Sequence, residues 1–141
     1  MNIKIATSKQ EINDAFHVRT IVFIEEQNVP VEEEMDRFDK DAIHLVGYIQ
    51  EKPIAASRLR WIDNYGKLER LCILKEHRGK SYGTKMIQKM ETETLKNGFN
   101  QTKLNAQTHA IKFYEQLGYK VFSEEFIDAG IPHVTMVKQL K

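Results

Sequence analysis

The stretch LERLCILKEHRGKSYGTKM, from Leu68 to Met86, constrains the fold of this chain more than any other. Its apolar residues up to Leu74 predict a buried strand, and apolar residues at helical spacing resume from Tyr82. Between them lies a turn that contains Gly79 and Gly83. A strand that passes through such a turn into a helix presents the free amides of the first helical turn, which favour an anion. The stretch therefore predicts a phosphate site at a strand–helix junction.

The expected phosphate site consists of consecutive residues of this turn. Glycine lets the backbone approach a ligand without a Cβ in the way, and an arginine and a lysine add cationic contacts. The dinucleotide fingerprint G-x-G-x-x-G and the P-loop G-x-x-x-x-G-K-[ST] are both absent. The alternative is a solvated turn whose glycines only shape the connection. The residues concerned are Arg78, Gly79, Lys80, Ser81, Tyr82, Gly83 and Thr84.

Hydrophobic periodicity divides the rest of the chain into strands and helices. Ser8 and Glu11 have capping-box spacing and mark the start of the first expected helix. Strands are expected at 2–6, 42–50, 53–62, 67–74, 102–107, 120–126 and 133–140, with a turn at 51–53. Helices are expected at 9–23, within 25–41, at 82–96 and at 109–119. This order predicts an α/β (α+β) fold with helices on the faces of a sheet.

Size and composition exclude several classes of protein. The 141 residues suffice for one core, so a single domain over residues 1–141 is expected. A net charge of +1 argues against nucleic acid as a partner, and no apolar run approaches the ~20 residues that cross a membrane. The single cysteine, Cys72, permits no internal disulfide, which suits the cytoplasm. The histidines lack paired ligand spacing, so no metal is expected.

A second motif follows the strand expected at 102–107. The segment QTHAIKFYEQLGYKVF, Gln107 to Phe122, together with the turn at 78–83, resembles the GNAT superfamily of acyl-CoA-dependent N-acyltransferases. In that family the turn reads [QR]-x-x-G-x-[GA], and the later segment reads Asn-x-x-Ala-x-x-Phe-Tyr-x-x-x-Gly-[FY]. Ser81 replaces the first glycine, and Gln107 replaces the asparagine. Nearly the whole chain, including VRTIVFIEEQNVP and DAGIPHVTM, is similar to a small bacterial branch labelled ElaA-like or YjcF-like.

The resemblance implies a fold, a cosubstrate and a reaction. The fold is a mixed, mostly antiparallel sheet of six to seven strands, splayed between the fourth and the fifth, with about four helices. The cosubstrate is acetyl-CoA, and its acetyl group passes to a primary amine of a small molecule or a peptide. Backbone groups of Leu71, Cys72 and Ile73 are expected to line the pantetheine, with Gln107 and Phe113 as further cofactor contacts. Ser81 is expected in the first helical turn, and a homodimer is compatible with the family.

Tyr114 matches the tyrosine of the family motif and is the expected general acid. A phenol that titrates near ~10 is close enough to a thiol near ~8.5 to protonate the departing thiolate. The alternative is that Phe113 and Tyr114 are an aromatic pair that only anchors the last helix to the sheet.

Glu69 is the expected general base, because apolar neighbours on its strand would raise the pKa of its carboxyl group. The alternative is a surface ion pair with Arg70. His133 and His44 are further candidates, since imidazole changes its protonation near neutral pH. Each is otherwise a structural histidine, and a water-mediated base is also compatible with the family. Cys72 lies in an apolar strand and is expected to be inert.

Two other functions explain some of the same features. A catalytically silent acyl-CoA-binding sensor would need the phosphate turn but not Tyr114. A protein-interaction module would use the acidic segment EEEMDRFDKD and the predicted hairpin, with the glycine turn incidental. That acidic segment is either a solvated face or an attraction for a cationic amine.

Overall fold

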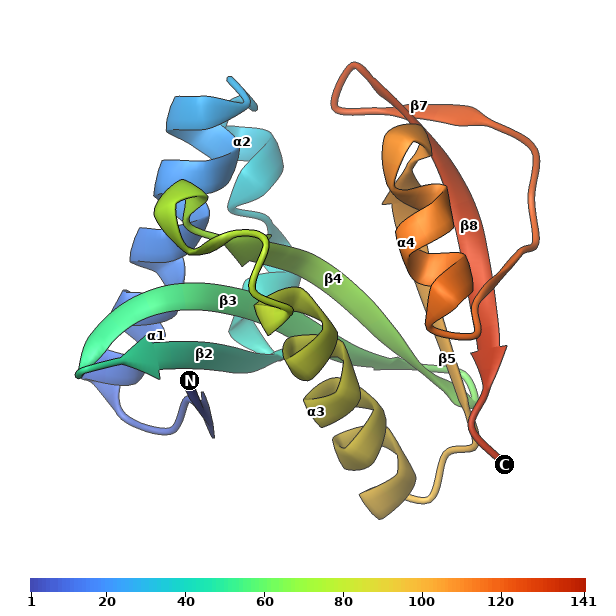
Figure 1. Ribbon diagram of the computed structural model, residues 1–141, viewed down its shortest axis with the longest axis horizontal. Coiled ribbons are helices and arrows are strands. Elements are labelled where there is room, and N and C mark those ends of the chain that lie inside the picture. The colour runs from blue at the N-terminus through green and yellow to red at the C-terminus, as the bar shows by residue number, and fades with distance from the viewer.

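The computed structural model describes residues 1–141, and its eight strands form one sheet in the order β1-β2-β3-β4-β5-β8-β6 (Figure 1). β7 also pairs with β8. β4 and β5 are parallel, whereas the other neighbouring strands are antiparallel. The expected mixed, mostly antiparallel sheet is therefore confirmed, with eight strands in place of six or seven. The strands are β1 Asn2–Ile5, β2 Ile43–Ile49, β3 Lys52–Ile62, β4 Tyr65–Ile73, β5 Gln101–Gln107, β6 Lys120–Val121, β7 Phe126–Asp128 and β8 Ile131–Gln139.

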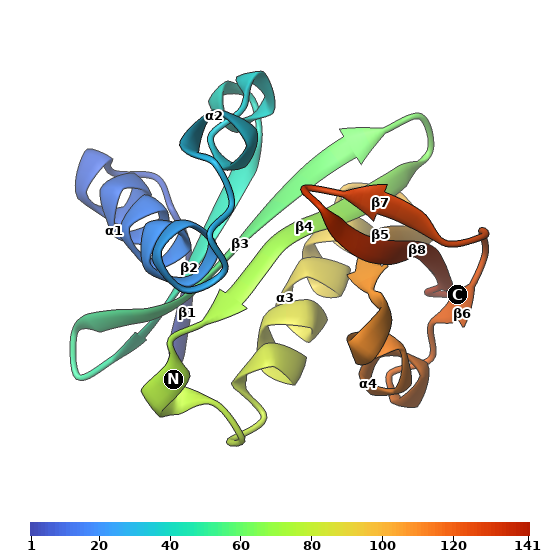
Figure 2. The ribbon, with the colours of Figure 1, turned by 90° about the horizontal axis from the view of Figure 1, so that it is seen from above.

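Helices cover both faces of the sheet. α1 and α2 lie on one face of β2–β4, and α3 lies on the other (Figure 2). The four α-helices are α1 Lys9–Arg19, α2 Val31–Glu34, α3 Tyr82–Lys96 and α4 Ile111–Gln116. Shorter helical segments are the π-helical η1 Thr20–Glu26 and the 3₁₀ turns η2 Arg37–Lys40, η3 Lys75–His77 and η4 Thr108–Ala110.

Each face buries its own apolar cluster. On the α3 face, Met86, Ile87 and Met90 pack into a core that also includes Leu104 of β5. On the α1 face, the smaller cluster consists of Ala15, Val18, Val22, Val46, Ala56 and Cys72. Burial of apolar area is the main stabilising term, at roughly 25 cal/mol per Å². The two clusters therefore fix β4 between helices on both sides, while its end remains available to a ligand.

The first helix is longer than its pattern predicts. The capping box at Ser8 is present, because the amide of Glu11 donates to Ser8 Oγ and the amide of Ser8 donates to Glu11 Oε1, each at 3.1 Å. α1 ends at Arg19 and continues as η1 to Glu26, three residues beyond the expected end at 23. The β-branched run that begins at Thr20 crowds the preceding turn, and the Thr20 hydroxyl donates to the carbonyl of Phe16 at 2.8 Å.

Two local expectations are corrected. The hairpin turn expected at 51–53 lies one residue earlier, at Gln50 and Glu51, which both have positive φ as a tight two-residue turn requires. The strand expected at 120–126 is divided into β6 and β7. Between them the Ser123 hydroxyl accepts the amide of Thr135 at 2.9 Å. A side chain thus replaces a backbone acceptor, which interrupts the strand at that point.

No helix in this chain combines the length and the apolar character that a membrane crossing requires.

Candidate active site

β4 and β5 separate where their pairing stops. Their parallel register includes only Gly66–Leu68 of β4 and Thr102–Leu104 of β5. Beyond these residues the two strands diverge (Figure 1), so 69–73 and 105–107 have no partner across the gap. The splay that the family resemblance implies between the fourth and fifth strands is confirmed. The unpaired backbone of two neighbouring strands is free to bind a ligand there.

Two cavities meet at this split. The larger has a volume of about 680 Å³ and extends toward α2 and the β7–β8 hairpin. The smaller, of about 630 Å³, extends toward the start of α3 and α4. Five residues line both cavities, so the two spaces adjoin: Gln27, Leu71, Gln107, His109 and Ile131. Two ligands that entered from opposite sides would therefore come into contact between β4 and β5.

The predicted phosphate turn lies beside the smaller cavity. α3 is 15 residues long, and no side chain caps its start. The amides of Tyr82, Gly83 and Thr84 belong to the first helical turn and have no partners within the helix. Open space surrounds the position of a Cβ at Gly79, whereas a Cβ at Gly83 would lie 3.6 Å from Phe113 Cζ. The turn thus has the shape and the polarity of an anion site.

The two cations of the turn differ in their partners. The guanidinium of Arg78 donates to both carboxylate oxygens of Glu26, at 2.7 and 2.8 Å, and to the carbonyl of Ile73 at 2.9 Å. Lys80 is exposed and makes no ion pair. Arg78 therefore fastens the end of η1 to the end of β4, and Lys80 is the free cation.

Ser81 does not occupy the helical first turn that the sequence suggested. It is the residue before α3, with φ of +64° and ψ of +19°, and its hydroxyl caps no amide. This left-handed conformation costs an L-residue roughly 1–2 kcal/mol, whereas glycine adopts it freely. This backbone conformation explains why the family motif has glycine at this position.

Replacement of Ser81 by glycine should stabilise the protein. The relief of left-handed strain exceeds the extra entropy that glycine has in the unfolded chain, so Ser81→Gly is expected to raise the free energy of unfolding by about 0.5–1 kcal/mol. The matched control is Gly79→Ser, at φ of +78° with open space for the side chain, which should destabilise by a similar amount. Urea unfolding measures the free energy of unfolding of both variants. If Ser81→Gly lowered it, the inferred strain at Ser81 would be contradicted.

Leu71, Cys72 and Ile73 form the end of β4 that has no partner on β5. A bulge precedes them: Ala56 pairs with Cys72, but Arg58 pairs with Glu69, and Arg70 has a φ of +56°. Bulges of this kind redirect side chains near active sites. The Cys72 thiol turns into the α1-side core, where Sγ lies 3.7 Å from the carbonyl of Ala56 and burial raises its pKa. Its thiolate is therefore disfavoured, as expected of an inert cysteine.

Gln107, Phe113 and Tyr114 come together on the opposite side of the split. Gln107 ends β5 and lines both cavities, and Phe113 of α4 lines the smaller one. The rings of Phe113 and Tyr114 meet edge to face at 5.0 Å. Tyr114 lines the larger cavity, and burial raises the pKa of its hydroxyl to about 12. At neutral pH this hydroxyl always carries its proton.

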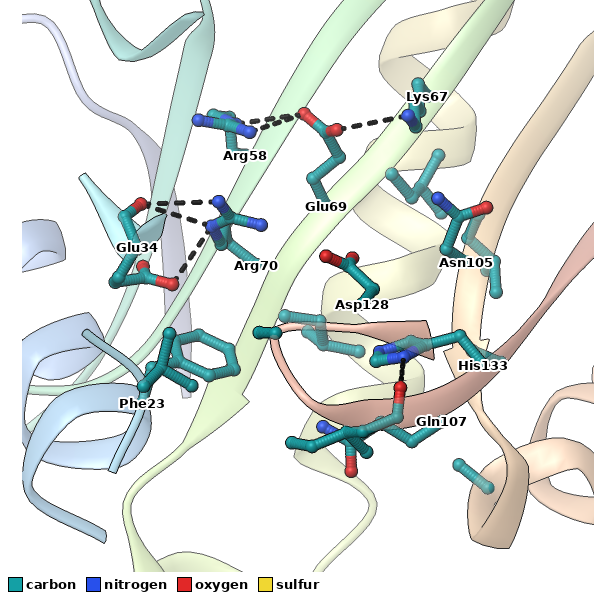
Figure 3. Close-up of a pocket in the computed structure, with 18 of the residues that line it drawn as sticks. Phe23, Glu34, Arg58, Lys67, Glu69, Arg70, Asn105, Gln107, Asp128 and His133 are labelled. Carbon is teal, nitrogen blue, oxygen red and sulfur yellow. Dashed lines mark hydrogen bonds and ion pairs between the residues drawn. The ribbon is translucent and has the colours of Figure 1, made fainter. Parts of the chain in front are cut away.

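Glu69 is surrounded by cations and not by apolar groups. Its carboxylate lies 2.9 Å from Arg58, 2.7 Å from Arg60 and 3.5 Å from Lys67 Nζ (Figure 3). Burial acts to raise its pKa, but the hydrogen bond from Arg60 and the charges of Arg58 and Lys67 hold the pKa below its ordinary value. The prediction of a raised pKa is wrong, because the cations come from β3 as well as from β4. A carboxylate in this state is a weak proton acceptor.

His133 is placed differently from His44. His133 lies on β8, is 8% exposed, and lines the larger cavity (Figure 3). Its Nδ1 lies 2.7 Å from the carbonyl of Ile131, which can only accept a hydrogen bond, so the proton of the neutral ring is on Nδ1. Nε2 is then an unprotonated acceptor. His44 lines neither cavity, contacts the carbonyl of Asp39 through Nε2 at 2.8 Å, and has its pKa lowered by burial.

The acidic segment forms one wall of the larger cavity. Glu34 and Asp36 are paired with arginines: Arg70 contacts Glu34 at 3.0 Å and Asp36 at 3.1 Å. Glu32, Glu33 and, across the cavity, Asp128 make no ion pair. The cavity therefore keeps three free carboxylates that a cationic amine can approach.

Two residues of this site were missed by sequence reasoning. Asp128 projects from the β7–β8 hairpin into the larger cavity (Figure 3). Gln27 lies 80 positions before Gln107 and contacts it across the split at 3.3 Å. Both residues lie in segments that resemble the bacterial branch, VRTIVFIEEQNVP and DAGIPHVTM, but only the fold places their side chains at the cavities.

Comparison with known proteins agrees with this architecture. Residues 6–140 match the family described as acetyltransferase (GNAT) domain. A Bacillus subtilis protein named uncharacterized N-acetyltransferase YjcF is 48% identical over 139 residues, which cover 98% of this chain and 99% of that protein. Escherichia coli ElaA has the same fold, with a TM-score of 0.84 at 24% identity over 98% of this chain and 97% of that one. A GNAT family acetyltransferase from Elizabethkingia anophelis, solved with acetyl-CoA bound, has a TM-score of 0.76 at 9% identity over 99% and 97%.

Proposed function

Since this chain belongs to the GNAT acetyltransferase family, we propose that it transfers an acetyl group from acetyl-CoA to a primary amine by direct attack. The observation that carries this proposal is the meeting of two cavities at the splay between β4 and β5. One cavity has an anion site at its entrance, and the other has free carboxylates and an imidazole. A phosphate-bearing donor and a cationic acceptor thus approach from opposite sides.

The donor side suits coenzyme A. The uncapped amides at the start of α3 and the free ammonium of Lys80 would hold the diphosphate, and the open space at Gly79 lets its oxygens approach the backbone. The end of β4 that has no partner on β5 would bind the amides of the pantetheine. Acetyl-CoA supplies a thioester, whose carbonyl carbon is activated toward amines.

The acceptor side suits an ammonium that must lose its proton. Glu32, Glu33 and Asp128 would attract it, and Nε2 of His133 would accept the proton. The neutral nitrogen then attacks the carbonyl carbon, a C–N bond forms, and the C–S bond breaks. The electron pair leaves on sulfur, so the protein must stabilise a thiolate until the second proton of the nitrogen is transferred to it, which leaves an amide and the CoA thiol.

Tyr114 would stabilise that thiolate as a hydrogen-bond donor. With its pKa at about 12 against ~8.5 for a thiol, complete proton transfer from Tyr114 is unfavourable. A hydrogen bond to a charged group contributes about 1.5–3 kcal/mol, which corresponds to roughly ten- to a hundredfold in rate.

The test of the proposed function is turnover of acetyl-CoA with a panel of amines, which includes polyamines, amino acids, aminoglycosides and peptides. The wild type is expected to release free CoA only when an amine is present. Tyr114→Phe should lower kcat about ten- to a hundredfold without a change in CoA affinity, because only the hydroxyl is lost. Tyr65→Phe, at the far end of β4, is the matched control and should retain full activity.

The same panel separates the proposed enzyme from its rivals. Binding of CoA without release from any amine would indicate an acyl-CoA sensor. Absence of thermal stabilisation by excess CoA would indicate an interaction module, since ligand at ~100 times its Kd adds ~2.7 kcal/mol. Either outcome would contradict the transferase.

A further inference from the structure

One side-chain contact lies where the two cavities adjoin. Gln27 follows η1 directly, and Gln107 ends β5. Nε2 of Gln107 donates to Oε1 of Gln27 at 3.3 Å, and both side chains line both cavities. This is the only side-chain hydrogen bond that joins residues 20–40 to residues 101–141. The Gln27–Gln107 pair therefore spans the gap where the strands diverge.

Neighbouring contacts hold the backbone at Gln27 and the side chain of Gln107 in place. The backbone amide of Gln27 donates to the carbonyl of Val22 at 3.1 Å, and the preceding residue, Glu26, is bound by Arg78 through two short hydrogen bonds. On the other side, Oε1 of Gln107 lies 2.6 Å from Nε2 of His109. The backbone of Gln27 and the side chain of Gln107 are thus held by separate contacts, and the side chain of Gln27 is held by Gln107.

We propose that Gln27, through its contact with Gln107, limits the acyl group to acetyl and discriminates against butyryl and longer chains. This inference rests on the proposed function, because the thioester must lie where the donor and acceptor cavities meet. Carbon atoms pack at about 3.5–4.0 Å from their neighbours, so a chain cannot pass between two amides that are 3.3 Å apart. A butyryl group has two more carbons than acetyl and would have to separate the pair and leave its hydrogen-bonding groups unmatched.

The test compares acetyl-CoA with butyryl-CoA for the wild type and for Gln27 variants. Calorimetry gives the Kd of each thioester, and kcat/KM is measured with any amine that is acetylated. The wild type should prefer acetyl-CoA by about tenfold or more, a common penalty for excess methylenes in a closed pocket. Gln27→Ala should reduce this preference to about twofold or less. Gln27→Met keeps the length of the side chain and should keep most of the preference, and Gln10→Ala on the exposed face of α1 should change nothing.

Several outcomes would overturn the proposal. Equal affinity of the wild type for the two thioesters would do so, as would an unchanged preference in Gln27→Ala. Loss of the preference in Gln27→Met would also overturn it, because methionine keeps the length of the side chain that is proposed to limit the acyl group. Thermal unfolding verifies that each variant is folded, and Gln27→Ser replaces Gln27→Ala if that variant is not. Failure of all amines to release CoA would contradict the transferase reaction, while the two Kd values would still test Gln27.

Discussion

His133→Gln is expected to lower kcat/KM for acetyl transfer by about 10²–10⁴-fold, the usual contribution of a positioned general base. Glutamine can keep the hydrogen bond to the carbonyl of Ile131, but its amide cannot take a proton from the acceptor ammonium. Affinity for CoA should be unchanged, because His133 lines only the larger cavity and not the smaller one beside the predicted phosphate turn.

The pH dependence separates a base from a structural histidine. An alkyl ammonium titrates near ~10.4, so raising the pH supplies more neutral amine from solution. The deficit of His133→Gln should therefore shrink as the pH approaches that value, whereas a damaged fold would show no such recovery. His17→Gln, on the exposed face of α1, is the matched control and should have wild-type rates. Wild-type kcat/KM in His133→Gln would exclude the base role and favour a water-mediated route.

Arg19→Met is expected to destabilise the protein by about 3–5 kcal/mol, the cost of removing one partner from a buried ion pair. The Arg19 side chain has no exposed surface. Its Nε contacts Glu34 at 2.7 Å, and its Nη1 contacts Asp39 at 2.7 Å. Methionine fills similar space but leaves these two carboxylates short of a cation in a region where Glu34 is only 3% exposed.

Urea unfolding measures this loss, with Arg37→Met as control. Arg37 is exposed and its guanidinium only lies over the ring of Phe38, so its replacement should change stability by about 0.5 kcal/mol or less.

Burial already raises the pKa of Glu34, and loss of Arg19 should raise it further. Protonation then relieves the unpaired charge, so the deficit should be smaller near pH ~5 than near pH ~8. A loss below about 1 kcal/mol at both pH values would contradict the importance of this pair.

Stability and function are connected through this ion pair. Arg19 holds Glu34 of α2 and Asp39 of η2, and these segments form one wall of the larger cavity. From the sequence, the acidic segment was either a solvated face or a surface that attracts a cationic amine. Its carboxylates fall into two groups. Glu34, Asp36 and Asp39 bind arginines within the protein, and Glu32 and Glu33 face the cavity without an ion pair.

Local patterns were sufficient for most of the fold. The strand–turn–helix from Leu68 onward, the capping box at Ser8 and the helix that precedes Asn97 each depend on residues within a few positions of one another. Expectations were wrong where a distant group intervened. The strand expected at 120–126 is divided because Ser123 bonds to Thr135 of another strand.

The candidate site could be predicted only in part. The predicted phosphate turn and Tyr114 each belong to a short motif with fixed spacing, and the family resemblance identified both motifs. Glu69 was expected to have a raised pKa because its neighbours in sequence are apolar, yet Arg58 and Arg60 reach it from β3. His133 was only one of several histidines until its Nδ1 was seen to be occupied and its Nε2 free.

Short-range spacing and apolar periodicity were sufficient to predict most of the strands and helices and the glycine-containing turn before α3, and the motifs were sufficient for the family. The tertiary structure alone decided which carboxylates are neutralised, which imidazole faces the cavity, and that Gln27 meets Gln107. Electrostatic and hydrogen-bonding partners are set by distances in space, and here several of them join residues that lie far apart in the chain, up to 80 positions for Gln27 and Gln107.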